Sequence, residues 1–188
     1  MLKSIGAATA ALGAVLLSGC ASLTPAAQSA SAPQPLKRID VGRFYAGLWH
    51  EIGRRPMSIT DGCVAGATRY GRGAGGEITV LDSCQIGTPE GEAKTIGGPG
   101  TILDPGFNAK LRVDYTLAGI VPIQQDYWVL DRADDYSWFI SADPTFRDLF
   151  IFTRSPAIGP AELRRLVNRA RSLGYDVSKL EFPAQPRR

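Results

Sequence analysis

Three cysteines and a single histidine limit the chemistry that this 188-residue chain can perform. Because His50 is the only histidine, a multi-histidine metal site cannot be built, and three cysteines are too few for a four-cysteine zinc cluster. A nucleophilic mechanism that depends on histidine would have to run through His50. No nucleophile elbow, phosphate-binding loop or metal-ligand spacing is present. The sequence therefore predicts no metal, no cofactor and no catalytic residue. An enzyme that uses His50 and Glu51 as acid and base is the less favoured alternative.

The first cysteine, Cys20, ends a segment that has the form of a lipoprotein signal. A short positive start precedes an apolar, alanine-rich run over residues 4–17, which is long enough for a signal-peptide core of about 7–15 residues. The run is too short to span a bilayer, which needs about 20 apolar residues. It ends in Leu17-Ser18-Gly19-Cys20, which resembles the bacterial lipobox, where the cysteine is lipidated and becomes the mature N-terminus. Residues 1–19 are thus expected to be a signal peptide and Cys20 the lipidation site. An ordinary secretory peptide with a cysteine near its cleavage site is the alternative.

The residues that follow the lipobox predict where the protein is held. Residues 20–36 are mostly Ala, Ser, Pro, Gln and Thr, a composition that buries too little apolar surface to fold, so they are expected to form a disordered tether. Ala21 stands where an Asp would retain an enterobacterial lipoprotein at the inner membrane. We therefore expect a lipid anchor in the outer membrane, facing the periplasm. The net charge of +3 is small and spread along the chain, which gives no reason to propose a nucleic acid partner.

The two remaining cysteines, Cys63 and Cys84, would lie in an oxidising compartment, where a disulfide is the natural expectation. They flank a segment that reads as a β-hairpin around the glycine-rich turn at residues 71–76. A turn centred between Gly73 and Ala74 would place the two cysteines opposite each other. Two buried free thiols are the alternative, because a bulge near the turn would shift the register by one residue.

The chain from residue 48 to 153 consists of short segments rich in Val, Ile, Thr and aromatic residues, separated by Gly, Pro, Asp and Asn. This rhythm is typical of an antiparallel sandwich or barrel rather than of βαβ units. The expected strands are residues 48–54, 64–70, 77–83, 92–96, 109–115, 126–130, 137–141 and 149–153.

One helix is expected after the strands. Pro160 suits a first helical position, the apolar residues from Leu163 to Leu173 recur at helical spacing, and Gly174 ends the pattern. The apolar stripe should lie against a sheet, and an arginine-rich face should point to solvent. A final extended run over residues 176–182 should return to the sheet. The fold class is therefore all-β with one C-terminal helix.

Three motifs in the right order carry a family resemblance. Gly47-Leu48-Trp49 resembles the Gly-x-Trp motif that opens the first strand of a lipocalin. The segments at 126–131 and 152–156 are similar to the second and third signature regions of that family. Together with the lipobox, the chain resembles a bacterial lipocalin of the outer-membrane lipoprotein type. The resemblance implies an eight-stranded up-and-down antiparallel β-barrel over residues 37–188, the lipocalin/calycin architecture.

The resemblance also assigns a structural role to two residues. It implies that Trp49 and Arg154 close one end of the barrel, with the guanidinium stacked on the indole. Such a contact stabilises by roughly 0.5 to 2 kcal/mol and leaves the guanidinium donors free to bond nearby carbonyls.

The barrel interior is expected to be lined by alternate residues of each strand, which are mostly apolar or aromatic with a few hydroxyls. This lining suits the apolar chain of a small hydrophobic ligand, such as a fatty acid or a lysophospholipid. The predicted ligand-binding residues are Thr68, Tyr70, Val80, Leu111, Val113, Tyr115, Trp128, Leu130, Trp138 and Phe150.

The sequence leaves other functions open. The same side chains would fill a solid core if the barrel held no void. A structural lipoprotein that binds a protein partner, and an enzyme that acts on a lipid, are the alternatives to a lipid-binding or lipid-transport protein. A homodimer is also compatible with the sequence.

Overall fold

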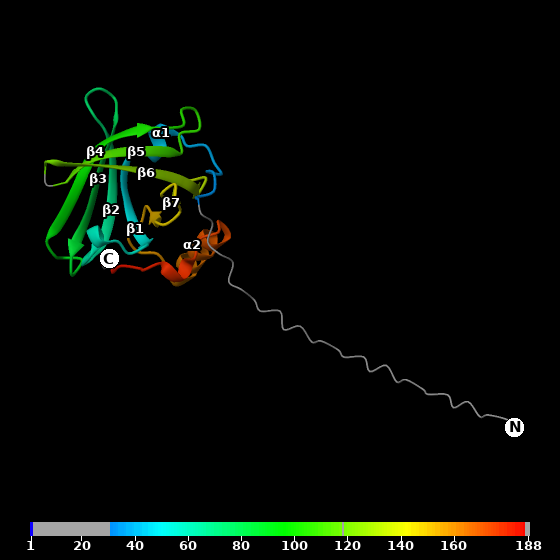
Figure 1. Cartoon of the computed structure of the whole chain (residues 1–188). Coiled ribbons are helices and arrows are strands. Elements are labelled where there is room, and N and C mark those ends of the chain that lie inside the picture. Colours follow the sequence, from blue (N-terminus) through cyan, green and yellow to red (C-terminus); the bar gives the residue numbers. More distant parts are fainter. Residues whose placement is uncertain (2–30, 118, 187–188) are drawn as a thin grey trace.

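The computed structural model describes residue 1 and residues 31–117 and 119–186, and Figure 1 shows these residues as a barrel with a helix on its outer side. The expected signal peptide at 1–19, the expected lipidation site Cys20 and the expected tether up to residue 30 therefore fall outside the described residues, apart from Met1. The eight strands form a closed barrel in which each strand pairs with the next and β1 pairs with β8. Their bounds are β1 Gly47–Arg54, β2 Cys63–Arg72, β3 Ile78–Ile86, β4 Ala93–Ile102, β5 Lys110–Leu117, β6 Val121–Arg132, β7 Trp138–Ala142 and β8 Leu149–Thr153. The expected up-and-down antiparallel barrel is confirmed.

The four helical elements are short except for one. They are α1 Val41–Phe44, η1 Ser58–Thr60, α2 Pro160–Ser172 and η2 Val177–Lys179, where η marks a 3₁₀ turn. None of the helices among the described residues is long and apolar enough to cross a membrane. Because the strands alternate in direction, the β1–β2, β3–β4, β5–β6 and β7–β8 connections all lie at one end of the barrel, which we call the mouth. The opposite end, which holds α1 and the start of β1, is the floor.

Strand β4 extends six residues beyond the expected end at Ile96, through the glycine-rich segment Gly97-Gly98-Pro99-Gly100. Glycine is required there because the neighbouring backbones come very close. A Cβ on Gly97 would lie 2.7 Å from the carbonyl oxygen of Val80, and a Cβ on Gly98 would lie 2.0 Å from that of Asp114. These glycines belong to the sheet, whereas glycine in a sequence is normally a sign of a turn.

The β2–β3 hairpin contains the expected disulfide between Cys63 and Cys84, but the expected register is wrong. Cys63 pairs with Ile86, and the Cα atoms of the two cysteines are 5.4 Å apart. Two features shift the register. The Gly73 N–H donates to the Glu77 carbonyl, so the turn is centred on Gly75. A bulge between Val64 and Ala67 then moves the pairing by one residue.

Loss of this disulfide is expected to lower the free energy of unfolding by about 3 kcal/mol, because a cross-link over some twenty residues restricts the unfolded chain. The measurement is urea unfolding of the Cys63→Ala/Cys84→Ala double variant beside the oxidised wild type. Equal midpoints with equal denaturant dependence would contradict this expectation, as would two free thiols in the denatured, non-reduced protein.

Helix α2 packs its apolar face on the outside of the barrel, with Leu166 and Ala170 fully buried. It begins at Pro160 as expected and ends one residue before Leu173. The C-terminal run forms η2 and then a single antiparallel bridge between Arg54 and Glu181, so it returns to the sheet as expected but is not extended over its first half. The Asp176 side chain accepts from the Ser178 N–H and thereby favours a turn there.

Residues 32–36, which composition assigns to the tether, lie against the barrel. The Ala32 N–H donates to the Pro144 carbonyl at 3.0 Å, and the Leu36 N–H donates to the Leu130 carbonyl at 2.9 Å. Ala32 is buried because it packs with Leu130 and the residues under α2. Residues 32–36 therefore belong to the packed domain and not to the expected tether.

Candidate functional site

The floor of the barrel is an aromatic layer around Trp49, which is completely buried. Its indole N–H donates to the Phe44 carbonyl at 3.1 Å, and the Phe139 ring meets it edge-on. The Arg154 guanidinium lies 3.5 Å from the indole centroid, and its Nη1 donates to the carbonyls of Ala46 and Leu48 at 2.9 Å. Trp49 and Arg154 thus lie stacked on each other at the end of the barrel opposite the mouth.

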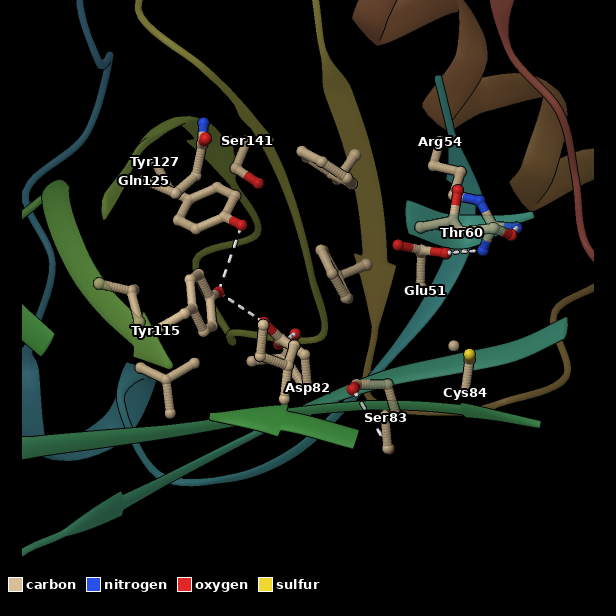
Figure 2. Close-up of a pocket in the computed structure, with 18 of the residues that line it drawn as sticks. Glu51, Arg54, Thr60, Asp82, Ser83, Cys84, Tyr115, Gln125, Tyr127 and Ser141 are labelled. Carbon is tan, nitrogen blue, oxygen red and sulfur yellow. Dashed lines mark hydrogen bonds and ion pairs between the residues drawn. The ribbon is translucent and has the colours of Figure 1, made fainter. Parts of the chain in front are cut away.

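Above this floor the barrel encloses a cavity of about 260 Å³, close to the lower end of the ~300–1,000 Å³ range of small-molecule pockets. The interior is therefore not a solid core. Figure 2 shows part of its lining. Seven of the ten residues that the sequence placed in the interior line this cavity: Thr68, Tyr70, Val80, Leu111, Val113, Tyr115 and Phe150.

Three expected lining residues lie outside the barrel, so their assignment to the cavity is wrong. Leu130 and Trp138 belong to the apolar cluster between the sheet and α2. Trp128 packs against the same cluster, and the Lys110 ammonium lies 3.9 Å from its ring centroid. On β6 and β7 both faces are apolar, because α2 covers the outer one, so alternation of apolar residues does not identify the inner face. The residues of these strands that do line the cavity are Gln125, Tyr127, Val129, Phe139 and Ser141.

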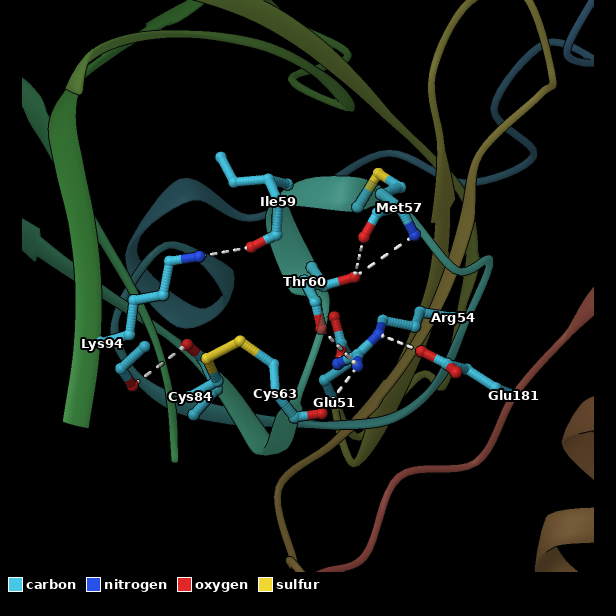
Figure 3. The surroundings of a disulfide bond; sticks show 11 residues. Glu51, Arg54, Met57, Ile59, Thr60, Cys63, Cys84, Lys94 and Glu181 are labelled. Atoms are coloured by element: carbon cyan, nitrogen blue, oxygen red, sulfur yellow. Dashed lines mark hydrogen bonds and ion pairs between the residues drawn. A yellow bond between two sulfur atoms is a disulfide. The ribbon is translucent and has the colours of Figure 1, made fainter. Parts of the chain in front are cut away.

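A buried ion pair lies near the mouth, where Glu51 and Arg54 of β1 line the cavity. Glu51 Oε1 is 2.6 Å from Arg54 Nη1, and Arg54 Nε is 2.7 Å from Glu181 Oε1. Arg54 Nη2 also donates to the Cys63 carbonyl, which links the pair to the disulfide, as Figure 3 shows. Burial raises the pKa of Glu51 to about 7 although Arg54 lowers it. All three nitrogens of the Arg54 guanidinium thus bond to protein groups, namely Glu51, Glu181 and the Cys63 carbonyl.

A second carboxylate, Asp82, lines the middle of the cavity on β3. Its two oxygens accept hydrogen bonds from the hydroxyls of Thr68 and Tyr115, each at 2.5 Å. The hydroxyls of Tyr115 and Tyr127 are 3.2 Å apart, so a chain of hydroxyls leads to the carboxylate, as Figure 2 shows. Burial raises the pKa of Asp82, while the hydrogen bonds from Thr68 and Tyr115 oppose that rise. Sequence reasoning missed this group, although Asp82 is two residues after the inward-facing Val80 and so lies on the same face of the strand.

The only histidine does not reach the cavity. His50 lies between the inward-facing Trp49 and Glu51 on β1, and it does not line the pocket. Burial lowers the pKa of its imidazole. Among the residues that the structure describes, no group of three His, Cys, Asp or Glu side chains is placed to hold a metal ion. The titratable groups that line the cavity are therefore carboxylates, phenols, Arg54 and Lys94, and His50 is not among them.

A closed eight-stranded barrel with a plugged floor and an internal cavity defines the architecture of a lipocalin. A family model described as a lipocalin-like domain matches residues 39–185, and the chain belongs to this family.

Two relatives and one solved structure resemble the chain over most of its length. Temperature-induced lipocalin-1 of Arabidopsis thaliana is 32% identical over 156 residues, which cover 80% of this chain and 81% of the relative. Outer membrane lipoprotein Blc of Vibrio cholerae is 24% identical over 173 residues, which cover 91% and 94%. Insecticyanin of the tobacco hornworm Manduca sexta superposes with a TM-score of 0.63 at 19% identity over 80% of this chain and 83% of that chain, a likeness of fold.

Proposed function

We propose that this protein is a lipid-anchored lipocalin of the outer membrane that binds and carries a small hydrophobic ligand with a single apolar chain. The observation that carries the proposal is the cavity of about 260 Å³. Its lower wall consists of apolar side chains such as Val80, Leu111 and Val113, all of which are buried. Burying apolar chain in such a pocket contributes roughly 0.8 kcal/mol per methylene group, offset by several kcal/mol of lost freedom, so micromolar affinity is expected.

Two observations support attachment to a membrane. The lipobox ends at Cys20, and one relative of this chain is named an outer membrane lipoprotein. In addition, the Ala32 N–H donates a hydrogen bond to the Pro144 carbonyl in the β7–β8 connection. The described segment that begins at residue 31 therefore lies at the mouth end of the barrel. Large apolar side chains are exposed at the same end: Ile59, Ile86, Leu117, Ile120 and Val121. A short tether from Cys20 would hold this apolar rim close to the bilayer.

Replacement of the proposed anchor, Cys20→Ser, is expected to release the protein from membranes into the soluble periplasmic fraction, because the variant has no lipid. The measurement is fractionation of cells that express either form, followed by detection of the protein in each fraction. A variant that stays with outer membranes as the wild type does would contradict the proposed anchor.

Ligand binding is tested by titrating a fluorescent fatty acid and a fluorescent lysophospholipid against the purified protein. Saturable binding at about one probe per barrel supports the carrier function. Absence of binding by both probes contradicts it. Steady hydrolysis of the lysophospholipid would instead place the protein among lipid enzymes, which the outward position of His50 argues against.

A further inference from the structure

We infer that Asp82 is the anchor of a ligand head group and that the cavity prefers amphiphiles whose head is a protonated amine. This inference rests on the proposed function and specifies the ligand class of the same cavity. The supporting observation is that one buried carboxylate inside the barrel has no cation beside it among the described residues.

Asp82 has no cationic partner in the described part of the protein. Its only hydrogen-bond donors are the neutral hydroxyls of Thr68 and Tyr115. The two cations that line the cavity are engaged elsewhere. Arg54 binds Glu51 and Glu181, and the Lys94 ammonium donates to the Ile59 carbonyl at 2.6 Å.

The hydroxyls around Asp82 can all act as hydrogen-bond donors toward it, which is the arrangement that suits an ionised carboxylate. A carboxylate only accepts hydrogen bonds, and both oxygens of Asp82 do so. Because the single hydroxyl hydrogen of Tyr115 is donated in the hydrogen bond to Asp82, Tyr127 is the donor between the two phenols, so both hydroxyls point along the chain toward the carboxylate. A negative charge held by neutral donors in a mostly apolar cavity is stabilised further by a cation, because a close opposite charge offsets the cost of burial.

The surrounding hydroxyls favour a cation as well. The hydroxyl of Tyr115 contacts the carboxylate and that of Tyr127 contacts Tyr115, and a phenol oxygen that donates its hydrogen can still accept one from an ammonium group. A fatty acid, by contrast, would bring a second negative charge toward Asp82 if its head entered first. It must therefore keep its carboxylate at the mouth, near Lys94.

The test uses decylamine, decanol and decanoate, which share one chain and differ in head-group charge, each measured by displacement of a fluorescent lipid at pH 7 and below the concentration at which it aggregates. Wild type is expected to bind decylamine about tenfold more tightly than decanol, as a buried ion pair is stronger than a neutral hydrogen bond. Asp82→Asn, which keeps the size of the side chain and removes its charge, should abolish the preference for decylamine over decanol.

The matched control is Asp114→Asn. Asp114 is exposed on strand β5 and faces outward, where it accepts a hydrogen bond from the Gln124 side-chain amide. The same loss of charge on the outer face should leave the preference for decylamine intact. A control that loses the preference would mean that the overall charge of the protein, and not Asp82, attracts the amine.

The outcomes separate the two proposals. If none of the three ligands displaces the probe from wild type, the cavity does not bind lipid and both proposals fall. If decanol and decanoate bind but decylamine has no advantage in wild type, the carrier function stands and the amine preference is wrong. If decylamine keeps its full advantage in Asp82→Asn, the carrier function stands and the assignment of the head group to Asp82 is wrong. If Asp82→Asn does not fold, Asp82→Ser serves as the uncharged variant, and absence of a decylamine advantage in wild type still overturns the inference.

Discussion

Trp49→Ala is expected to lower the free energy of unfolding by about 3 to 5 kcal/mol, because it leaves a cavity in the aromatic layer that closes the barrel. The size of the effect follows from complete burial of the indole and from its contacts with Phe44 and Phe139. Chemical unfolding of wild type and variant measures it. A decrease in the free energy of unfolding below about 1 kcal/mol would show that neighbouring side chains repack into the space left by the indole.

Arg154 should be coupled to Trp49. Arg154→Lys is expected to lower the melting temperature less than Trp49→Ala does, because lysine keeps the charge but loses the planar stacking and the bonds to Ala46 and Leu48. A double-mutant cycle reports the coupling directly. An interaction energy near zero would contradict the stacked contact.

Val113→Asp is expected to abolish binding of fluorescent fatty acid and lysophospholipid. Val113 is fully buried and lines the cavity, so the new carboxylate must either be hydrated by water that displaces the lipid or take up a proton. Probe titration measures the loss, and circular dichroism establishes that the variant is folded.

The matched control for Val113→Asp is Thr116→Asp, which places the same side chain at an exposed position on the same strand. This control should bind the probes as wild type does. Equal binding by folded Val113→Asp and by wild type would show that the probes bind somewhere other than the cavity.

Local patterns predict most of this fold. Eight runs rich in β-branched and aromatic residues correspond to the eight strands, and Pro160 marks the start of α2. The pattern fails in the Gly97–Gly100 segment, where glycine serves a close approach of backbones instead of a turn. A sequence does not show which distant backbone approaches, so this extension of β4 could not be predicted.

The candidate site is only partly predictable for a similar reason. Alternation identifies the inner face where the outer face is polar, as on β5 around Val113. It fails for Trp128, Leu130 and Trp138, because α2 makes both faces of β6 and β7 apolar. Asp82 interrupts the apolar alternation of β3, so a pattern of apolar residues does not identify it, although its position two residues after Val80 places it on the inner face.

The central claim, that the barrel carries a hydrophobic ligand, is tested most directly by mass spectrometry of organic extracts from gently purified protein. Wild type is expected to release a single-chain amphiphile at close to one molecule per barrel, and Val113→Asp purified in the same way is expected to release none. If wild type releases no small molecule above the level found with Val113→Asp, the cavity carries nothing and the proposed function is wrong.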